Sequence, residues 1–131
     1  MIKIDDEQKM ILETVQRIAA REIAPKAAEL DETAGFPKYA VDVFAENGLL
    51  NPLLPAQYGG VELGFLIFSM ILEEIGKVCA SSALLLIAQA DGMLPILHGG
   101  SEDLKQKYLD QLSGDSPKLT ALAATEPSAG S

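Results

Sequence analysis

Asp91 is the residue of this sequence whose surroundings most suggest chemistry. Its neighbours at helical spacing, Leu84, Ile87, Ala88 and Leu94, are all apolar. Burial among such side chains disfavours the charged form of a carboxylate and so raises its pKa. A carboxylate whose pKa is raised binds a proton more readily and can act as a base. The alternative is an ordinary aspartate at a helix end or in a subunit contact. Residue types alone leave both readings open.

Residues 122–131 form a second candidate site. The small residues of this stretch lead into Thr125-Glu126-Pro127-Ser128-Ala129-Gly130-Ser131. A turn with glycine and hydroxyl groups lets the backbone approach a diphosphate closely. The alternative is an ordinary strand followed by a turn with Pro127 and Gly130, and composition alone favours it.

The other reactive side chains predict no metal or phosphate site. Cys79 is the single cysteine and His98 the single histidine, so neither has a partner of its own kind. We expect a buried, reduced thiol at Cys79 and a helix end at His98. The segment Gly99-Gly100-Ser101 lacks the lysine and spacing of a phosphate-binding loop.

Charge and hydropathy narrow the class of protein. The sequence has 10 Lys and Arg against 19 Asp and Glu, a net charge of −9, which argues against nucleic acid and anionic membranes as partners. The longest apolar run, residues 83–88, is far shorter than a membrane span. Residues 1–7 resemble neither a signal peptide nor a transit peptide. We therefore expect a cytoplasmic protein without a membrane span.

Helical periodicity dominates the elements that would position these residues. The pattern predicts an all-α domain of about five helices, in an orthogonal-to-bundle arrangement, with one strand at its C-terminal end. A capping box of Asp5 and Gln8 begins the first helix, Pro25 bends it, and Ser81 or Ser82 caps the fourth. The expected helices are 5–34, 37–47, 63–79, 82–97 and 101–113, with an ordered loop at 49–61 and a strand at 119–125.

Three segments carry a resemblance to a known family. Residues 55–60, Pro-Ala-Gln-Tyr-Gly-Gly, are similar to the Pro-x-x-Tyr-Gly-Gly loop of FAD-dependent acyl-CoA dehydrogenases. Residues 100–109 resemble the family's Gly-Ser/Thr-Glu-x-x-Lys-x-Lys-Tyr/Trp-Leu segment, and residues 122–131 resemble its flavin-binding signature, Thr-Glu-Pro-x-Ala-Gly-Ser. The chain departs from the family at Glu62, where glycine is common, and at Asp110, where proline is common. In this order the three segments resemble the N-terminal domain of the family along the whole chain.

The resemblance implies a division of the chain and a set of site residues. Residues 1–116 would be the helical N-terminal domain, and 117–131 the start of the middle flavin-binding β-domain. The implied contacts with FAD are Leu122, Ala123, Ala124, Thr125, Gly130 and Ser131. The implied contacts with the acyl-CoA substrate are Ala83, Leu84, Ile87, Asp91 and Ser131. The family's usual catalytic glutamate lies in a C-terminal domain outside this chain, whereas relatives that desaturate alicyclic acyl-CoAs, of the cyclohexene-carboxyl-CoA type, use an aspartate from this helix as base.

The resemblance also implies an activity. The full-length protein would dehydrogenate an acyl-CoA thioester to an enoyl- or dienoyl-CoA, with hydride passing to FAD and electrons to an electron-transferring flavoprotein, as a homotetramer. We expect the 131-residue chain alone to be inactive. Two alternatives stay open: an acyl-CoA oxidase or flavin hydroxylase on the same scaffold, and a non-catalytic helical interaction module if the protein ends at Ser131.

Overall fold

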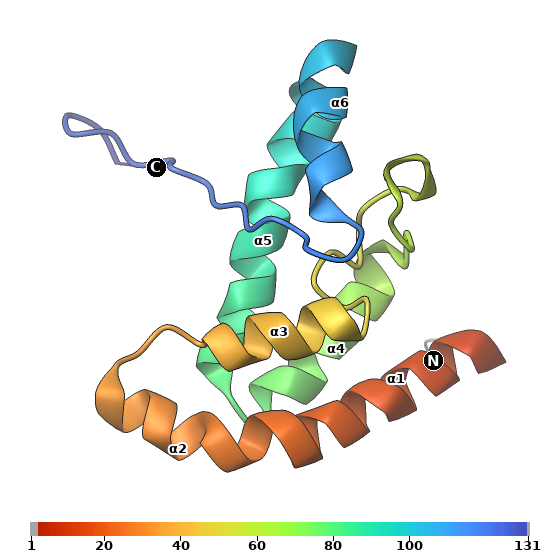
Figure 1. Ribbon diagram of the computed structural model, residues 1–131, viewed down its shortest axis with the longest axis vertical. Coiled ribbons are helices and arrows are strands. Elements are labelled where there is room, and N and C mark those ends of the chain that lie inside the picture. Colours follow the sequence, from red (N-terminus) through yellow and green to blue (C-terminus); the bar gives the residue numbers. More distant parts are fainter. Residues whose placement is uncertain (1–2, 131) are drawn as a thin grey trace.

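The computed structural model describes residues 3–130, which form an all-α domain as predicted. Within that range α1, a π-helical turn and α2 join into one rod, so the domain has five helical bodies (Figure 1). The elements are α1 (Asp6–Ile18), η1 (Ala19–Ile23), α2 (Ala24–Thr33), α3 (Lys38–Glu46), η2 (Ala56–Tyr58), α4 (Gly64–Gly76), α5 (Ala80–Gly99), α6 (Glu102–Leu109) and η3 (Asp110–Leu112).

The first rod begins with the predicted capping box. The Asp5 side chain accepts a hydrogen bond from the Gln8 backbone N–H at 2.8 Å, and the Gln8 side chain accepts from the Asp5 N–H at 3.1 Å. The predicted disturbance at Pro25 takes the form of the π-helical turn, in which the Ala24 N–H donates to the Ala19 carbonyl. Pro25 then lies in the first turn of α2, where its missing N–H costs no intrahelical bond.

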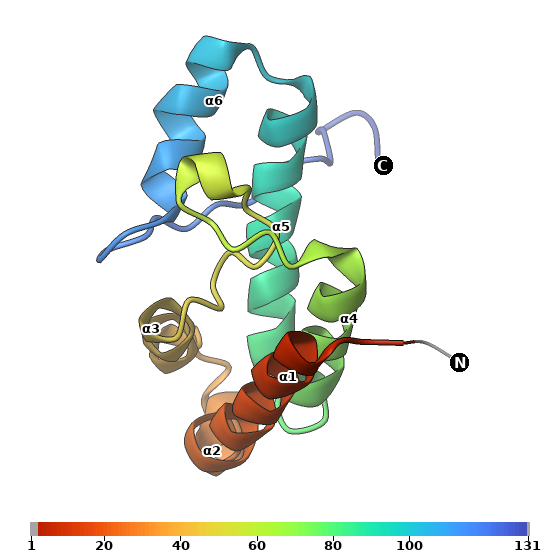
Figure 2. The same cartoon turned by 90° about the vertical axis from the view of Figure 1, so that its right-hand side faces the viewer.

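The core lies where α5 meets the other helices. Figure 1 shows α5 along the long axis of the molecule, with the α1–α2 rod crossing one end; Figure 2 shows α6 beside the other end. α4 packs against both α1 and α5. The core is almost entirely aliphatic, as the composition suggests; its fully buried members include Val15, Ile23, Phe44, Leu54, Ile67, Ile71, Ile75, Leu86, Met93 and Leu109.

The predicted cap of α5 was wrong. The helix begins at Ala80, with Cys79 in the N-cap position, so Ser81 and Ser82 both lie inside its first turn. Ser82 is fully buried and donates its hydroxyl to the Cys79 Sγ at 3.2 Å. The Ser82 hydroxyl therefore bonds a buried thiol and not a free backbone N–H of the first turn. Cys79 is buried, as predicted.

α5 is long and apolar enough to cross a membrane by length and composition alone. Its packing indicates a different role. It contacts α4 on one side and α6 on the other, and it carries buried polar side chains at Ser82 and Gln89. A helix that is apolar nearly all round is also typical of a helix enclosed by its neighbours.

Residues 113–130 leave the helices and cross α5, and the C-terminal end then projects away from the bundle (Figure 1). The segment 119–125 is extended but forms no strand with any other part of residues 3–130, in contrast to the prediction. A strand needs a partner for its ladder hydrogen bonds, and the described helices offer none. The one bridge in this region joins Glu126 to Ala129 across a tight turn.

Candidate functional site

α5 presents one exposed face that contains the predicted base. Leu84, Ile87 and Asp91 follow one another at intervals of three and four residues, so they share a face of the helix. Leu84 is 62 % exposed and Ile87 37 %, and Asp91 is exposed as well. The burial expected for Asp91 is therefore not supplied by the rest of residues 3–130. A carboxylate beside two exposed aliphatic side chains forms a surface that a hydrophobic ligand with one acidic C–H could cover.

Ala83 does not share this face. It is buried, and it lies against Gly76 of α4 in the core. Leu84, one residue further along, is turned about 100° around the helix axis and faces outward. The structure thus brings together three of the five predicted substrate-contact residues and places Ala83 in the helix–helix interface, while Ser131 lies outside the described residues.

The predicted flavin-contact segment is open along its length. Leu122, Ala123, Ala124 and Thr125 are all exposed, and within residues 3–130 their backbone groups make no hydrogen bond. The turn that follows is held by a pair of hydrogen bonds between the backbones of Glu126 and Ala129, at 2.9 and 3.3 Å. Gly130 is exposed, with open space around its Cα, and Ser131 lies outside the described residues.

Gln89 holds the approach to this segment against α5. Its side-chain Oε1 accepts a hydrogen bond from the Thr120 N–H at 2.8 Å, and its Nε2 donates to the Lys118 carbonyl at 2.9 Å. The Thr120 hydroxyl donates to the Gln89 backbone carbonyl at 2.8 Å. Three hydrogen bonds therefore tie residues 118–120 to a single turn of α5.

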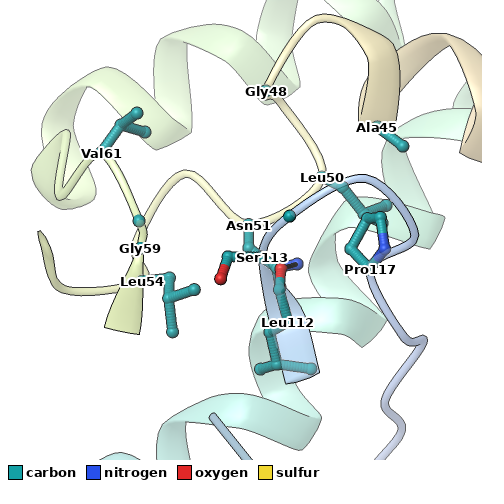
Figure 3. Close-up of a pocket in the computed structure, with 12 residues that line it drawn as sticks. Ala45, Gly48, Leu50, Asn51, Leu54, Gly59, Val61, Leu112, Ser113 and Pro117 are labelled. Atoms are coloured by element: carbon teal, nitrogen blue, oxygen red, sulfur yellow. Dashed lines mark hydrogen bonds between the residues drawn. The ribbon is translucent and has the colours of Figure 1, made fainter. Parts of the chain in front are cut away.

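Asn51 extends the same network to the loop before α4. It accepts from Gln89 Nε2 at 3.0 Å and donates its own Nδ2 to the Leu112 carbonyl at 2.8 Å. Figure 3 shows Asn51 between Leu112, Ser113 and the loop, lining a pocket of about 100 Å³. Ligand pockets are typically several hundred Å³, so this space suits a few waters and not an acyl-CoA.

Gly92 permits the close crossing of the two segments. A Cβ on Gly92 would lie 2.6 Å from the Ala121 backbone nitrogen and 2.6 Å from the Thr120 Cβ. Those distances are shorter than any van der Waals contact, so a larger residue would push the segment off the helix. Asp91 precedes this glycine, so the base candidate lies one residue from the point where the chain passes towards Leu122.

Sequence reasoning missed Gln89, Asn51 and Gly92. The available signal was a glutamine and a glycine within helix 82–97, whose other residues are apolar apart from Ser82 and Asp91, since a buried amide requires partners. Those partners are 29 to 38 residues away in the sequence, and no local pattern identifies them.

The ionisable groups with altered pKa values lie on other elements. A hydrogen bond donated by Lys77 lowers the pKa of Glu74 on α4, and the hydrogen bond that Lys105 on α6 donates to Glu102 raises the pKa of Lys105. Burial raises the pKa of Tyr39 on α3. Within residues 3–130, histidine, cysteine and acidic side chains form no cluster of three suited to a metal ion. Among the three residues of the exposed face of α5, Leu84, Ile87 and Asp91, only Asp91 has an ionisable side chain.

Known proteins share both the sequence and the fold. Residues 5–115 match the family described as acyl-CoA dehydrogenase, N-terminal domain. The chain is 63 % identical over 131 residues to cyclohex-1-ene-1-carbonyl-CoA dehydrogenase of Geobacter metallireducens, covering all of this chain and 34 % of that protein.

Two solved structures superpose closely. The glutaryl-coenzyme A dehydrogenase–glutaryl-CoA complex has a TM-score of 0.86 at 30 % identity, and the FAD complex of PigA a TM-score of 0.82 at 29 % identity. Each match covers 99 % of this chain and 34 % of the other. The chain thus spans about a third of the length of its relatives, and it belongs to the acyl-CoA dehydrogenase N-terminal domain family.

Proposed function

We propose that this chain is the N-terminal third of an FAD-dependent dehydrogenase that desaturates an alicyclic acyl-CoA. Residues 1–116 form the helical wall of the acyl pocket, and residues 117–131 begin the flavin-binding β-domain. The name of the Geobacter relative, at 63 % identity, supports a cyclohex-1-ene-1-carbonyl thioester as the substrate. The matched residues 5–115 agree with a helical domain that ends close to position 116.

The observation that carries this proposal is the position of Asp91. Its carboxylate shares an exposed face with Leu84 and Ile87, one residue before the glycine at which the chain crosses towards the flavin signature. A ring packed on the two aliphatic side chains would present its C–H bonds to the carboxylate. The ring would also cover Asp91 and exclude water, which favours proton uptake by a carboxylate.

The reaction balances with one base and one acceptor. Asp91 takes a proton from one ring carbon, and a hydride leaves a second ring carbon. The electron pair left by the proton forms a new C=C bond in the ring. Bound FAD would supply the two-electron acceptor for that hydride, and residues 122–125 would hold it. Because the base comes from the helical domain, the carbon that loses the proton need not be the α-carbon of the thioester.

The described residues fit a flavin. The backbone of Leu122–Thr125 is exposed and free of hydrogen bonds within residues 3–130. Its N–H groups and the Thr125 hydroxyl can therefore donate hydrogen bonds to the edge of a flavin ring. The open space around Gly130 leaves room for a diphosphate. Electron-transferring flavoprotein as acceptor and a homotetrameric assembly are further parts of the proposal, and both rest on the family resemblance.

The test is anaerobic mixing of the full-length, FAD-loaded protein with cyclohex-1-ene-1-carbonyl-CoA, while the visible absorbance of the flavin is followed. The proposal expects rapid bleaching, slower bleaching with the saturated ring thioester, and slow oxygen consumption when air is admitted. Absence of bleaching with any CoA thioester contradicts it, and rapid oxygen consumption identifies an oxidase instead.

A further inference from the structure

Both hydrogens of the Gln89 side-chain amide nitrogen are donated to acceptors inside the domain. Its side chain is 1 % exposed, its two Nε2 hydrogens go to the Lys118 carbonyl and to Asn51 Oδ1, and its Oε1 accepts from Thr120. The two ends of the amide are not interchangeable here, because one end meets acceptors and the other meets a donor. Neither an aliphatic residue nor a glutamate can make the same set.

The hydrogen bonds to Lys118 and Thr120 also fix a register. The two bonds reach the backbone of Lys118 and Thr120, which are alternate residues of an extended segment. If this segment shifted by one residue along α5, its backbone groups would no longer face the Gln89 amide. The Thr120 hydroxyl, bonded to the Gln89 carbonyl, adds a contact that only a hydroxyl residue at position 120 can make. Gly92 then allows the backbone of Ala121 to touch the helix.

We propose that Gln89, with Asn51 behind it, is a positioning residue that sets the register in which the flavin-binding segment passes Asp91. Residues 122–125 follow directly from the fixed Thr120–Ala121 crossing, and Asp91 lies on the same turn of α5. The network therefore fixes the distance between the flavin-binding residues 122–125 and Asp91. Proton removal by Asp91 and hydride transfer to the flavin both require this distance to be constant. This catalytic consequence rests on the proposed function, whereas the register itself does not.

The register is tested on the 131-residue chain by hydrogen exchange of the Thr120 amide, read by NMR. Gln89→Met keeps the size of the side chain and removes its hydrogen bonds, so we expect roughly tenfold or greater loss of protection at Thr120. Amides inside α1, which Gln89 does not contact, should be unchanged. Full protection of Thr120 in this variant overturns the proposal.

A second pair of variants applies if Gln89→Met does not fold. Thr120→Val is nearly isosteric and lacks the hydroxyl donor, whereas Thr120→Ser keeps it. We expect lowered protection at position 120 in Thr120→Val and recovery in Thr120→Ser. Equal protection in the two variants contradicts the assigned role of the hydroxyl.

The catalytic consequence is tested in the full-length FAD-loaded protein. Misplacement of about 1 Å can cost roughly a hundredfold in rate, so flavin reduction in Gln89→Met should slow by roughly tenfold to a hundredfold while KM for the acyl-CoA changes little. Unchanged reduction despite lost Thr120 protection overturns the positioning role.

Asp91→Asn separates this proposal from the proposed function. It should slow flavin reduction by roughly a hundredfold to ten-thousandfold and leave Thr120 protection intact. If the unaltered protein fails to bleach with any acyl-CoA, the proposed function fails, and the exchange result still decides the register.

Discussion

Asn51 and Gln89 are two buried side-chain amides in a core otherwise made almost entirely of aliphatic side chains. Each satisfies the other, and both hold backbone carbonyls of the segment that leaves the domain. Loss of one partner would leave buried polar groups without hydrogen bonds, which costs more than the net contribution of the bond itself.

Asn51→Ala should therefore lower the free energy of unfolding by about 1–3 kcal/mol, because the Leu112 carbonyl and one Gln89 N–H lose their partner. Urea denaturation followed by circular dichroism measures the change. Asn47→Ala is the control for an exposed amide: water can replace its one side-chain hydrogen bond, to the Val43 carbonyl, so its effect should be smaller, within about 1 kcal/mol. Equal effects at the two positions would argue against a buried network.

The Glu74–Lys77 pair on α4 predicts a pH dependence. The 2.7 Å hydrogen bond from Lys77 lowers the pKa of Glu74, so its contribution to stability is present above the unfolded-state pKa and disappears as pH falls through the folded-state pKa. Glu74→Gln should cause a small loss of stability near pH 7, and this loss should shrink as the pH falls through the lowered folded-state pKa, because below that pKa the carboxylate is protonated in both states. A loss that grows on acidification would contradict this.

Residue types predicted part of the site. The apolar neighbours of Asp91 marked it as unusual, and the structure places it on one face with Leu84 and Ile87. Helical spacing did not reveal that Ala83 faces the core, because α5 is apolar on every side and offers no polar stripe for orientation. The exposure of Asp91 could not be inferred for the same reason.

At the scale of elements, the loop before α4 depends on one close approach. A Cβ on Gly60 would collide with the carbonyl group of Leu54, so the loop of residues 55–60 folds back on itself only with glycine there. This explains in physical terms why the family pattern ends in glycine at this position. Residues 55–60 belong to the longer loop at 49–61, which also carries Asn51 and thereby supports the network around Gln89.

Gly60→Ala should destabilise the domain by roughly 2 kcal/mol or more, since backbone must move to admit a methyl group. Gly99→Ala, at the end of α5, is the control, because a Cβ there meets nothing within 4 Å. That substitution should be neutral or stabilise by up to about 1 kcal/mol. Thermal unfolding of both variants decides the matter, and similar melting temperatures would disprove the predicted clash.

The end of α2 carries a second local feature. Ala34 ends the helix in the left-handed region, at φ 48°, a conformation that costs a residue with a Cβ about 1 kcal/mol or more. Ala34→Gly should therefore stabilise the domain by up to about 1 kcal/mol. Ala28→Gly, at an exposed position inside α2, should destabilise it by about 0.5–1 kcal/mol. Effects of the same sign in chemical denaturation would refute the assigned conformation.

The positions of the helices could be predicted from hydrophobic periodicity, capping residues and glycines, because each of these signals lies within or beside the helix it marks. The capping box at Asp5 and the side-chain N-cap at Ser101 are both present, and the loop at 49–61 contains the short helix η2. The start of α5 was missed because Ser82 is a good N-cap residue that the fold uses as a buried hydroxyl instead. Tertiary packing decided that case, and no local pattern records it.

At the scale of the whole molecule, the domain has surfaces that fit an enclosing partner. Phe65 and Leu66 on α4 and Leu122 in the signature are exposed by 60, 44 and 54 %. The described part of the flavin signature is open to solvent throughout. A flavin bound to this chain alone would gain a few backbone hydrogen bonds and bury little of its ring.

The 131-residue chain should therefore not retain FAD. Gel filtration of the chain mixed with FAD, followed by an absorbance spectrum of the protein peak, measures this directly. We expect no visible flavin band in that peak, whereas the full-length protein should keep one. A band that survives with the chain alone would show that the helical domain holds the cofactor by itself.

The central claim is that Asp91 is the base of an acyl-CoA dehydrogenase. Its most direct test is single-turnover flavin reduction by cyclohex-1-ene-1-carbonyl-CoA in the full-length Asp91→Asn variant, with Asp31→Asn, an exposed aspartate on α2, as control. The account predicts that Asp91→Asn slows reduction by roughly a hundredfold to ten-thousandfold without loss of FAD, and that the control matches the unaltered protein. Reduction at the unaltered rate in Asp91→Asn would contradict the account.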